Sequence, residues 1–245
     1  LIDLSQLSPM MQHYMETKKE YPDCVLFYRL GDFYEMFFDD ALTVSKELEI
    51  TLTGKDCGLA ERAPMCGVPF HAVDSYLYRL VQKGYKVAIA EQMEDPRQAK
   101  GLVKREVIRV VTPGTITSSQ VLDETKNNYL MGIVYMDGVY GISTADISTG
   151  DFMVTEVDSD RELFDEINKF SPSEIICNNA FYMSGVDMDE LKNRYQVVIS
   201  ALDSRFFGEE SCRRVLMEHF RVGALVGLGL EDYATGIIAA GAVMQ

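Results

Sequence analysis

The side chains with the clearest chemical potential are Phe33 and Glu35, which lie in the run Gly-Asp-Phe-Tyr-Glu-Met-Phe-Phe at residues 31–38. An exposed aromatic ring can wedge against a planar partner, and a carboxylate two residues later can hydrogen-bond a group beside that ring. Two structural alternatives stay open. Phe33 precedes Phe37 by four residues and could extend a buried helical stripe, and Glu35 could be a solvated carboxylate in the first turn of that helix. The choice between a probe and a structural residue therefore decides the function.

A strand, a glycine turn and a helix are predicted to position this motif. The apolar run at residues 25–30 is typical of a strand, Gly31 ends it, and the apolar spacing from Phe37 onward predicts a helix that begins inside the motif. The other elements of the first half alternate between helix and strand, which indicates an α/β or α+β domain. They are a helix at 9–20, strands at 50–53, 87–91 and 107–111, a charged loop at 54–63 and a helix at 72–83.

The second half opens with three apolar runs separated by Asp137-Gly138 and Thr149-Gly150. Asp-Gly between such runs is a strong hairpin signal, so a β-meander is predicted. The predicted elements are strands at 129–135, 139–145 and 151–156, a helix at 162–170, a strand at 174–177 and a final apolar segment at 237–244. Because this last segment stops without a cap, we expect the chain to be part of a longer protein.

A break in the pattern at the Thr-Pro-Gly of residues 112–114 predicts a domain boundary. The polar stretch after it is typical of a linker. We therefore expect a domain at residues 1–112, a linker at 113–128 and a second domain at 129–245.

The composition excludes several classes of protein. With 245 residues, of which 47% are hydrophobic and 25% charged, the chain can bury real cores and differs from a disordered chain. No apolar run approaches the roughly 20 residues that a membrane helix needs, so we expect a soluble, cytoplasmic protein. The five cysteines are an odd number without a Cys-x-x-Cys pair, and we expect free thiols rather than a zinc site.

The formal net charge of −15 argues against indiscriminate affinity for nucleic acid, since such binding depends on neutralising phosphates. The charge is uneven, because residues 1–112 hold 14 Lys and Arg against 17 Asp and Glu, whereas residues 113–245 hold 9 against 21. The first half can therefore present a local basic face. Arg105 and Arg109 lie four residues apart on a predicted strand and should share one face. The candidates for phosphate contacts are Lys55, Arg62, Lys104, Arg105 and Arg109.

Across nearly all of its length the sequence resembles the N-terminal part of the MutS family of bacterial DNA mismatch-repair proteins. The matching motifs follow the family's order and are too many and too long for chance similarity. They are Tyr-Pro-Asp at 21–23, Leu-Phe-Tyr-Arg at 26–29, Gly-Asp-Phe-Tyr-Glu at 31–35, Gly-Val-Pro-Phe-His-Ala-Val at 67–73, Glu-Gln at 91–92, Val-Val-Thr-Pro-Gly-Thr at 110–115 and Asp-Ile-Ser-Thr-Gly at 146–150.

The resemblance implies an α/β fold of mixed α+β type, in which a small mixed-sheet mismatch-binding domain precedes a connector domain of ribonuclease H-like fold. It implies that Phe33 enters the minor groove and stacks on a mispaired base, and that Glu35 hydrogen-bonds that base. Glu35 could do so as an ionised acceptor or as a protonated donor, and we expect its charge to penalise matched duplex at least as much as it attracts a mismatch. The candidates for contacts to the DNA backbone are Lys55, Lys104, Arg105 and Arg109, among which the resemblance favours Arg105 and Lys55.

The resemblance also implies partners beyond the duplex. Family members are ATPases that use ATP and Mg²⁺, act as homodimers and contact MutL through the connector, which couples the sensor to the ATPase. No Gly-x-x-x-x-Gly-Lys-Ser/Thr phosphate loop occurs in the sequence, so we expect neither a cofactor site nor enzymatic activity within it.

Two other functions stay open. Four carboxylates at residues 32–40 and Asp146 in the second half raise the possibility of a metal-dependent, ribonuclease H-like nuclease, which needs convergent carboxylates. Asp39 and Asp40 are adjacent on a predicted helix, however, and Asp146 has no clear third partner. The other alternative is an interaction module without DNA specificity of its own, which suits the acidic residues 129–245.

Overall fold

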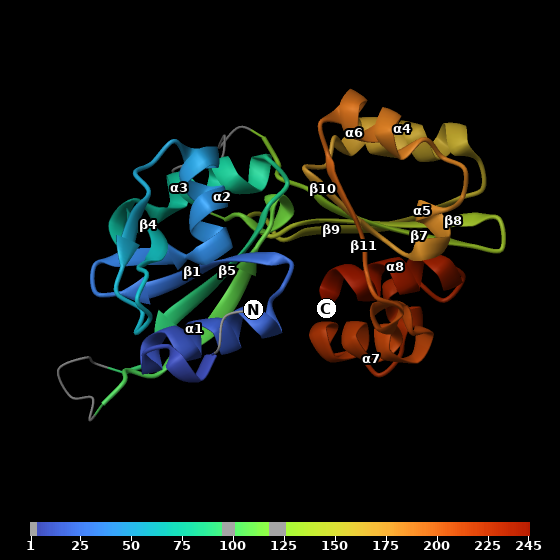
Figure 1. The fold of residues 1–245 in the computed structure, drawn as a ribbon. Coiled ribbons are helices and arrows are strands. Elements are labelled where there is room, and N and C mark those ends of the chain that lie inside the picture. The colour runs from blue at the N-terminus through green and yellow to red at the C-terminus, as the bar shows by residue number, and fades with distance from the viewer. Residues whose placement is uncertain (1–3, 95–100, 118–125) are drawn as a thin grey trace. The chain divides into compact units, whose positions relative to one another are not determined.

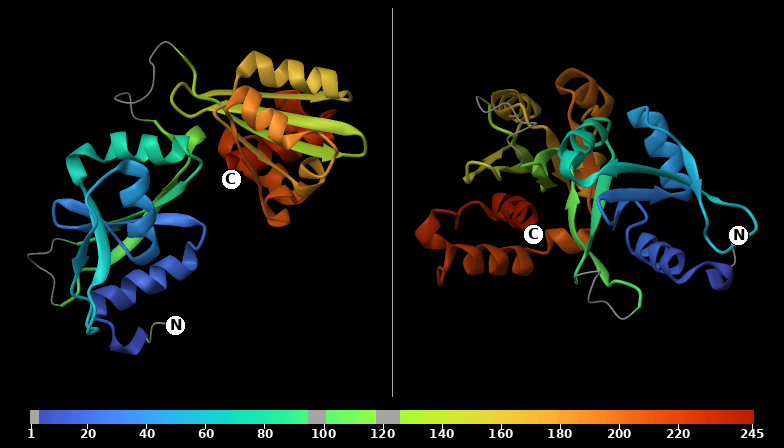
Figure 2. Two further views of the ribbon diagram at one scale, coloured as in Figure 1. Left: turned by 45° about the horizontal axis from the view of Figure 1, so that its top comes forward. Right: turned by 90° about the vertical axis from the view of Figure 1, so that its left-hand side faces the viewer.

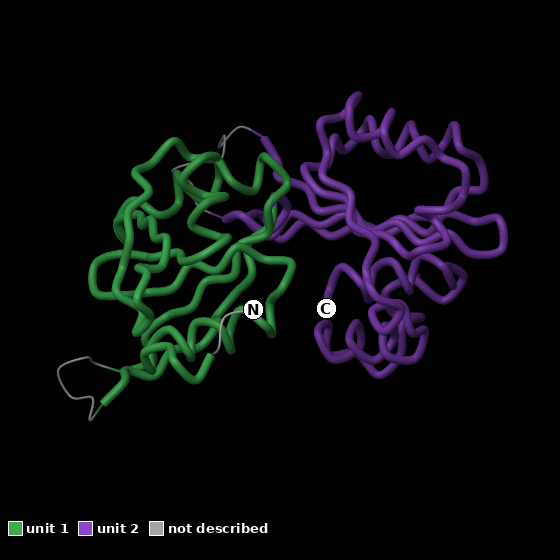
Figure 3. The backbone as a smooth tube through the Cα atoms, in the orientation of Figure 1, with its two compact units in different colours: residues 1–112 green, residues 113–245 purple. Residues whose placement is uncertain are grey.

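The computed structural model describes residues 4–94, 101–117 and 126–245. The chain divides into two compact units, residues 1–112 and residues 113–245, which Figure 3 draws in different colours. Each unit has its own β-sheet and its own hydrophobic core. Within the described ranges, no helix combines the length and the apolar character that crossing a bilayer requires.

The first unit contains a six-stranded mixed sheet with helices on both faces (Figure 1). Its strand order is β3-β4-β2-β1-β5-β6, in which β1 and β5 are parallel and the other neighbours antiparallel. The strands are β1 (Cys24–Leu30), β2 (Phe33–Phe37), β3 (Thr53–Lys55), β4 (Ala63–Pro69), β5 (Lys86–Gln92) and β6 (Arg105–Val111). The helices are α1 (Pro9–Glu20), α2 (Phe38–Leu48) and α3 (Val73–Gln82), with 3-10 turns η1 (Leu4–Gln6) and η2 (Phe70–Ala72).

Alternation along these strands sends side chains into two core layers. On one face, Leu26, Tyr28 and Phe37 pack with Met11 and Tyr14 of α1. On the opposite face, α2 contacts β2 and β4, and α3 contacts β4 and β5. The β1–β2 hairpin therefore lies in the middle of the sheet, fixed between helices on both sides.

The motif at residues 31–38 forms a β-hairpin that leads into a helix, so a strand that was not predicted, β2, lies between the predicted glycine turn and the predicted helix. Leu30 pairs with Phe33 across a two-residue turn, and β2 continues to Phe37 before α2 begins. The helix predicted from Phe37 is confirmed to within one residue, because α2 begins at Phe38. Strand β2 was not predicted, because it depends on pairing with both β1 and β4, which the local spacing of apolar residues does not reveal. Phe38 has a φ of 55°, and this left-handed conformation turns the chain from strand into helix.

Two expectations for the strands of the first unit are wrong. The strand predicted at 50–53 is displaced, since β3 begins only at Thr53. Strand β4 follows the predicted loop at 54–63, in a segment for which no strand was predicted. Strand β4 contains two prolines and a glycine, which are depleted from strand interiors, so its sequence does not indicate a strand. The remaining predicted elements of this unit are confirmed to within two residues, namely those at 9–20, 25–30, 72–83, 87–91 and 107–111.

The second unit contains a five-stranded mixed sheet in the order β11-β10-β7-β8-β9. Strands β7, β8 and β9 form an antiparallel meander. Strand β10 pairs in parallel with β7, and β11 pairs in parallel with β10. This is the strand order of a ribonuclease H-like fold, and the predicted fold class is confirmed. The strands are β7 (Leu130–Met136), β8 (Val139–Asp146), β9 (Asp151–Val157), β10 (Glu174–Cys177) and β11 (Val198–Ala201).

Helices cover both faces of this second sheet (Figure 2). One face packs on α4, α5 and α6, and the other on α7 and α8. The predicted meander and the elements at 162–170 and 174–177 are confirmed, and the final apolar segment lies within α8. The helices are α4 (Asp160–Phe170), α5 (Asn179–Tyr182), α6 (Met188–Tyr195), α7 (Glu209–Phe220) and α8 (Ala234–Met244), with 3-10 turns η3 (Pro113–Thr115), η4 (Ser204–Phe207) and η5 (Leu225–Leu228).

The helix α8 lies directly against β7 and β8 because glycines leave room for its backbone. A Cβ atom added at Gly141 of β8 would lie 2.3 Å from the main-chain oxygen of Thr235. One added at Gly132 of β7 would lie 2.5 Å from a methyl group of Val243 and 3.0 Å from the main-chain oxygen of Ala239. The close contact between helix and sheet in this unit therefore depends on the missing side chains.

Candidate nucleic-acid interface

Phe33 lies at the start of β2, directly after the turn of the β1–β2 hairpin. Its side chain is 46% exposed. Gly31, the first residue of the turn, has a φ of 58°, which glycine adopts without steric cost and which two-residue hairpin turns require. Phe33 pairs with Leu30 on one side and with Pro69 of β4 on the other, so the main chain beneath the exposed ring is held on both sides. The alternative in which Phe33 extends a buried helical stripe is wrong.

Glu35 lies two residues further along β2 and therefore on the same face of the sheet as Phe33. Its side chain is 15% exposed, and its Oε2 accepts a hydrogen bond from Lys55 Nζ at 2.5 Å. Lys55 ends the edge strand β3, and its ammonium lies 5.7 Å from the centroid of the Phe37 ring. The alternative of a solvated carboxylate in a helical turn is wrong, because Glu35 is a strand residue with a cationic partner.

Gly67 is a site residue that the sequence analysis did not single out. It pairs with Glu35 across the β2–β4 ladder. A Cβ atom added there would lie 3.5 Å from Glu35 Cγ and 3.8 Å from Phe33 Cδ1. The absence of a side chain at Gly67 therefore leaves open the space between the exposed ring and the carboxylate.

The opposite face of the hairpin is stabilised by Arg29, Tyr34, Phe70 and Glu91. The guanidinium of Arg29 lies 3.6 Å from the centroid of the Phe70 ring and 3.5 Å from Glu91 Oε1. The Tyr34 hydroxyl donates a hydrogen bond to the same oxygen, and burial together with the Glu91 carboxylate raises the pKa of Tyr34. These contacts join β1, β2 and β5, so Phe33 and Glu35 project from a fixed platform.

Arg105, predicted as a contact to the DNA backbone, has its partners inside the protein. Its side chain is 5% exposed, and its guanidinium donates hydrogen bonds to the main-chain oxygens of Arg29 and Val103, both at 2.7 Å. The guanidinium also lies 5.0 Å from the centroid of the Tyr28 ring. In this conformation Arg105 connects β6 to β1 and presents little of its charge to solvent.

The expected common face of Arg105 and Arg109 is wrong. Arg105 pairs with Gln92 of β5 and Arg109 pairs with Ile89, and these two partners lie three residues apart. A bulge between Ile89 and Ala90 shifts the register, so the two arginines point to opposite faces. Sequence spacing cannot reveal such an inserted residue.

The remaining candidates for phosphate contacts are exposed. Arg62 and Arg109 lie at the surface of the first unit. Lys104 is also exposed, and its ammonium pairs with the Glu106 carboxylate at 2.6 Å. All three stay candidates for contacts to the backbone.

The four carboxylates expected near the motif do not converge. Asp40 is buried and accepts hydrogen bonds from the Tyr14 hydroxyl at 3.2 Å, the Lys18 ammonium at 2.9 Å and the Leu26 N–H at 2.9 Å. It therefore joins α1 and β1 to α2. Glu35 pairs with Lys55, and the other two carboxylates are exposed. In the part of the chain that the structure describes, no three His, Cys, Asp or Glu side chains gather as a metal site would require.

Asp146 ends β8 and organises the turn into β9. Its Oδ1 accepts hydrogen bonds from the Ser148 main-chain N–H at 2.8 Å and hydroxyl at 2.6 Å, and its Oδ2 accepts one from the Asn128 N–H at 2.9 Å. Burial alone would raise the pKa of Asp146, but these hydrogen bonds outweigh burial and lower it. Both carboxylate oxygens are thus occupied by the protein's own backbone, which is a structural role.

We expect Asp146→Ala to lower the free energy of unfolding at neutral pH by about 1–3 kcal/mol, because the N–H groups of Ser148 and Asn128 lose their acceptor. The folded pKa lies below the unfolded value, so the ionised group stabilises the fold above about pH 4, and this contribution is lost as the pH falls through the folded pKa. Urea unfolding at about pH 7, 5 and 3 should show a difference between wild type and variant that shrinks on acidification. An equal difference at all three values would contradict this role.

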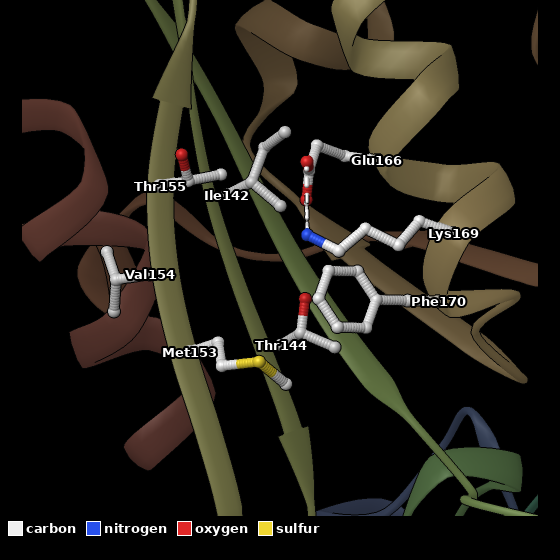
Figure 4. Close-up of a pocket in the computed structure, with 8 residues that line it drawn as sticks. All are labelled: Ile142, Thr144, Met153, Val154, Thr155, Glu166, Lys169 and Phe170. Carbon is white, nitrogen blue, oxygen red and sulfur yellow. Dashed lines mark hydrogen bonds and ion pairs between the residues drawn. The ribbon is translucent and has the colours of Figure 1, made fainter.

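The second unit also contains a cavity of about 290 Å³ between β8, β9 and α4, shown in Figure 4. Glu166 and Lys169 form an ion pair at 3.3 Å on its α4 side, so their charges compensate each other. Glu166 is the one carboxylate among the lining residues, whereas metal-dependent cleavage needs several. The lining residues are Ile142, Thr144, Met153, Val154, Thr155, Glu166, Lys169 and Phe170.

The five cysteines are buried and free. Burial raises the pKa of Cys66 and that of Cys177 to about 12, and the pKa of Cys212 to about 11. These three thiols are therefore protonated at neutral pH and are poor nucleophiles.

Two family models match successive parts of the chain. Residues 8–120 match the family model described as MutS domain I, and residues 128–245 match MutS domain II. Its relatives include three proteins named DNA mismatch repair protein MutS. The chain is 61% identical over 99% of its length to the one from Lachnoclostridium phytofermentans, 53% over 99% to that from Acetivibrio thermocellus and 50% over 99% to that from Ruminiclostridium cellulolyticum.

The chain spans only 26% to 28% of the length of these relatives. The two domain matches follow each other without overlap and together account for most of its residues. The chain therefore belongs to the MutS family, of which it carries domains I and II.

Proposed function

We propose that the chain is the sensing part of a DNA mismatch-repair protein and that Phe33 is its probe. The observation that carries the proposal is the exposed ring of Phe33 on a hairpin whose main chain is fixed on both sides. The name shared by the relatives supports DNA mismatch repair as the process. The ring would enter the minor groove and stack on a mispaired or unpaired base, kinking the duplex.

The energetics favour a mismatch over a matched pair. Unstacking a base step costs a few kcal/mol, and stacking a base on an aromatic side chain returns about 1–3 kcal/mol. The two nearly cancel on matched DNA. At a mismatch the step is already weakened, so bending and unstacking cost less and the balance favours binding. Discrimination would thus come from the deformability of the duplex.

Glu35 would supply a second discrimination by hydrogen-bonding the displaced base. It lies on the same strand face as Phe33, and the space between the two is open at Gly67. A carboxylate close to phosphates also repels duplex that offers it no partner, so Glu35 would penalise matched DNA. Of the cations, we propose the exposed Lys104 and Arg109 as contacts to the backbone.

The second unit would act as a connector. We propose a partition into a mismatch-binding domain at 1–112, a linker at 113–128 and a connector at 129–245, in which the connector couples the sensor to an ATPase and to MutL in a homodimeric, cytoplasmic protein. ATP and Mg²⁺ would bind outside these residues, and the residues themselves would carry no catalysis. The strongly acidic composition of 113–245 supports contact with protein rather than with DNA.

The proposal is tested by fluorescence anisotropy with the full-length protein and two labelled duplexes, one with a G·T mismatch and one fully matched, at one stated salt concentration. We expect the mismatched duplex to bind roughly tenfold more tightly. Equal affinities would overturn the proposal and favour an interaction module without DNA specificity. Metal-dependent cleavage of either duplex would favour the nuclease alternative instead.

A further inference from the structure

Lys55 and Glu35 form an ion pair that spans three strands. Lys55 lies on the edge strand β3, Glu35 lies on β2, and β4 runs between them. Lys55 pairs with Ala63 of β4, whereas Glu35 pairs with Gly67, four residues further along the same strand. The long lysine side chain therefore crosses β4 diagonally on the face that carries Phe33.

Both partners of this ion pair are partly shielded from water. The Lys55 side chain is 33% exposed and the Glu35 side chain 15%. The ammonium also lies near the face of the Phe37 ring, which is fully buried. A charge-assisted hydrogen bond with shielded partners fixes geometry more firmly than an exposed surface pair does.

We propose that Lys55 is a positioning residue for Glu35 and sets mismatch discrimination through it, rather than acting as a contact to a phosphate. The inference rests on the proposed function of Phe33 and Glu35. Lys55 holds the carboxylate beside the open space at Gly67, within reach of a base that stacks on Phe33.

The two roles of Lys55 predict different measurements. A phosphate contact contributes to the affinity for matched and mismatched duplex alike, and its removal leaves their ratio unchanged. A positioning residue changes the ratio, and it does so only while Glu35 is present. The ratio of the two dissociation constants therefore separates the roles, and a double-mutant cycle assigns the effect to Glu35.

The experiment measures this ratio by anisotropy for full-length wild type, Lys55→Met, Glu35→Ala and the double variant. We expect Lys55→Met to reduce the preference for a G·T mismatch by about threefold to tenfold. In the Glu35→Ala background the same substitution should leave the ratio unchanged. Lys55→Arg, which keeps a cation that can reach the carboxylate, should restore the preference to within about twofold of wild type.

Lys104→Met is the matched control, because it removes an exposed lysine that pairs with Glu106 and not with Glu35. It should weaken both duplexes equally. The inference about Lys55 would be overturned if Lys55→Met left the ratio of the two dissociation constants unchanged, or if it changed this ratio equally in the wild-type and Glu35→Ala backgrounds. In either case a mismatch preference in wild type would still uphold the proposed function. A wild-type ratio near one would instead overturn the proposed function itself.

Discussion

Substitution Phe33→Ala is expected to remove the preference of the full-length protein for mismatched DNA. The ring would supply the stacking that offsets unstacking of the duplex, so its loss should weaken mismatch binding by about 1–1.5 kcal/mol, the lower end of the range for stacking and a factor of roughly 5 to 12. Affinity for matched duplex should change little, because backbone contacts come from other residues. The fold should tolerate the change, since 46% of the side chain is already exposed and the hairpin is held by main-chain pairing. Anisotropy with both duplexes and a thermal melt would measure both effects.

Phe70→Ala is the matched control for this experiment. Its side chain is 45% exposed, nearly the same as that of Phe33, but the ring packs on Arg29 and Tyr34 on the other side of the hairpin. We expect the variant to keep the mismatch preference, because Arg29 and Tyr34 still hydrogen-bond Glu91 and join β1, β2 and β5. An equal loss in the two variants would assign the preference to the hairpin surface as a whole, and a preference retained in Phe33→Ala would return that ring to a structural role.

The sequence singles out residues 31–38 as the candidate site, whereas it does not reveal their conformation. Aromatic density, a glycine and a carboxylate two residues after Phe33 point to residues 31–38. Helical spacing from Phe37 onward correctly predicts α2, but the same spacing left open that Phe33 extends this helix. Pairing with β4, more than 30 residues away, decides that Phe33 and Glu35 belong to a strand.

The partners of the charged residues could not be predicted for a related reason. Lys55 reaches Glu35 only because β3, β4 and β2 lie side by side, and the sequence contains no signal for that order. A strand without a bulge would place Arg105 on the same face as the exposed Arg109. In the structure Arg105 is buried, and its guanidinium donates hydrogen bonds to main-chain oxygens. By contrast, the meander of the second unit was predicted well because Asp137-Gly138 specifies its first turn locally.

Gly141→Ala is expected to be the most destabilising of the substitutions considered. The added Cβ would lie 2.3 Å from the oxygen and 2.4 Å from the carbon of the Thr235 carbonyl, and 2.7 Å from the Gly236 nitrogen. All three are main-chain atoms at the start of α8, so relief requires the helix to move away from β8. That movement would also break the hydrogen bond from the Gly236 N–H to Glu156 Oε1, which measures 2.8 Å.

We expect Gly141→Ala to lower the free energy of unfolding by about 3 kcal/mol, which is the upper end of the usual cost of overpacking a core. The melting temperature should fall by on the order of 10 °C. Gly132→Ala should have a smaller effect, since its closest contact is the Val243 side chain and the nearest main-chain atom is 3.0 Å away. Gly223→Ala is the control, because a Cβ atom there meets open space, and its effect should stay within about 0.5 kcal/mol. Circular dichroism during urea unfolding would rank the three variants. If Gly141→Ala were no more destabilising than Gly223→Ala, the close contact between α8 and β8 would not contribute to the stability of this unit.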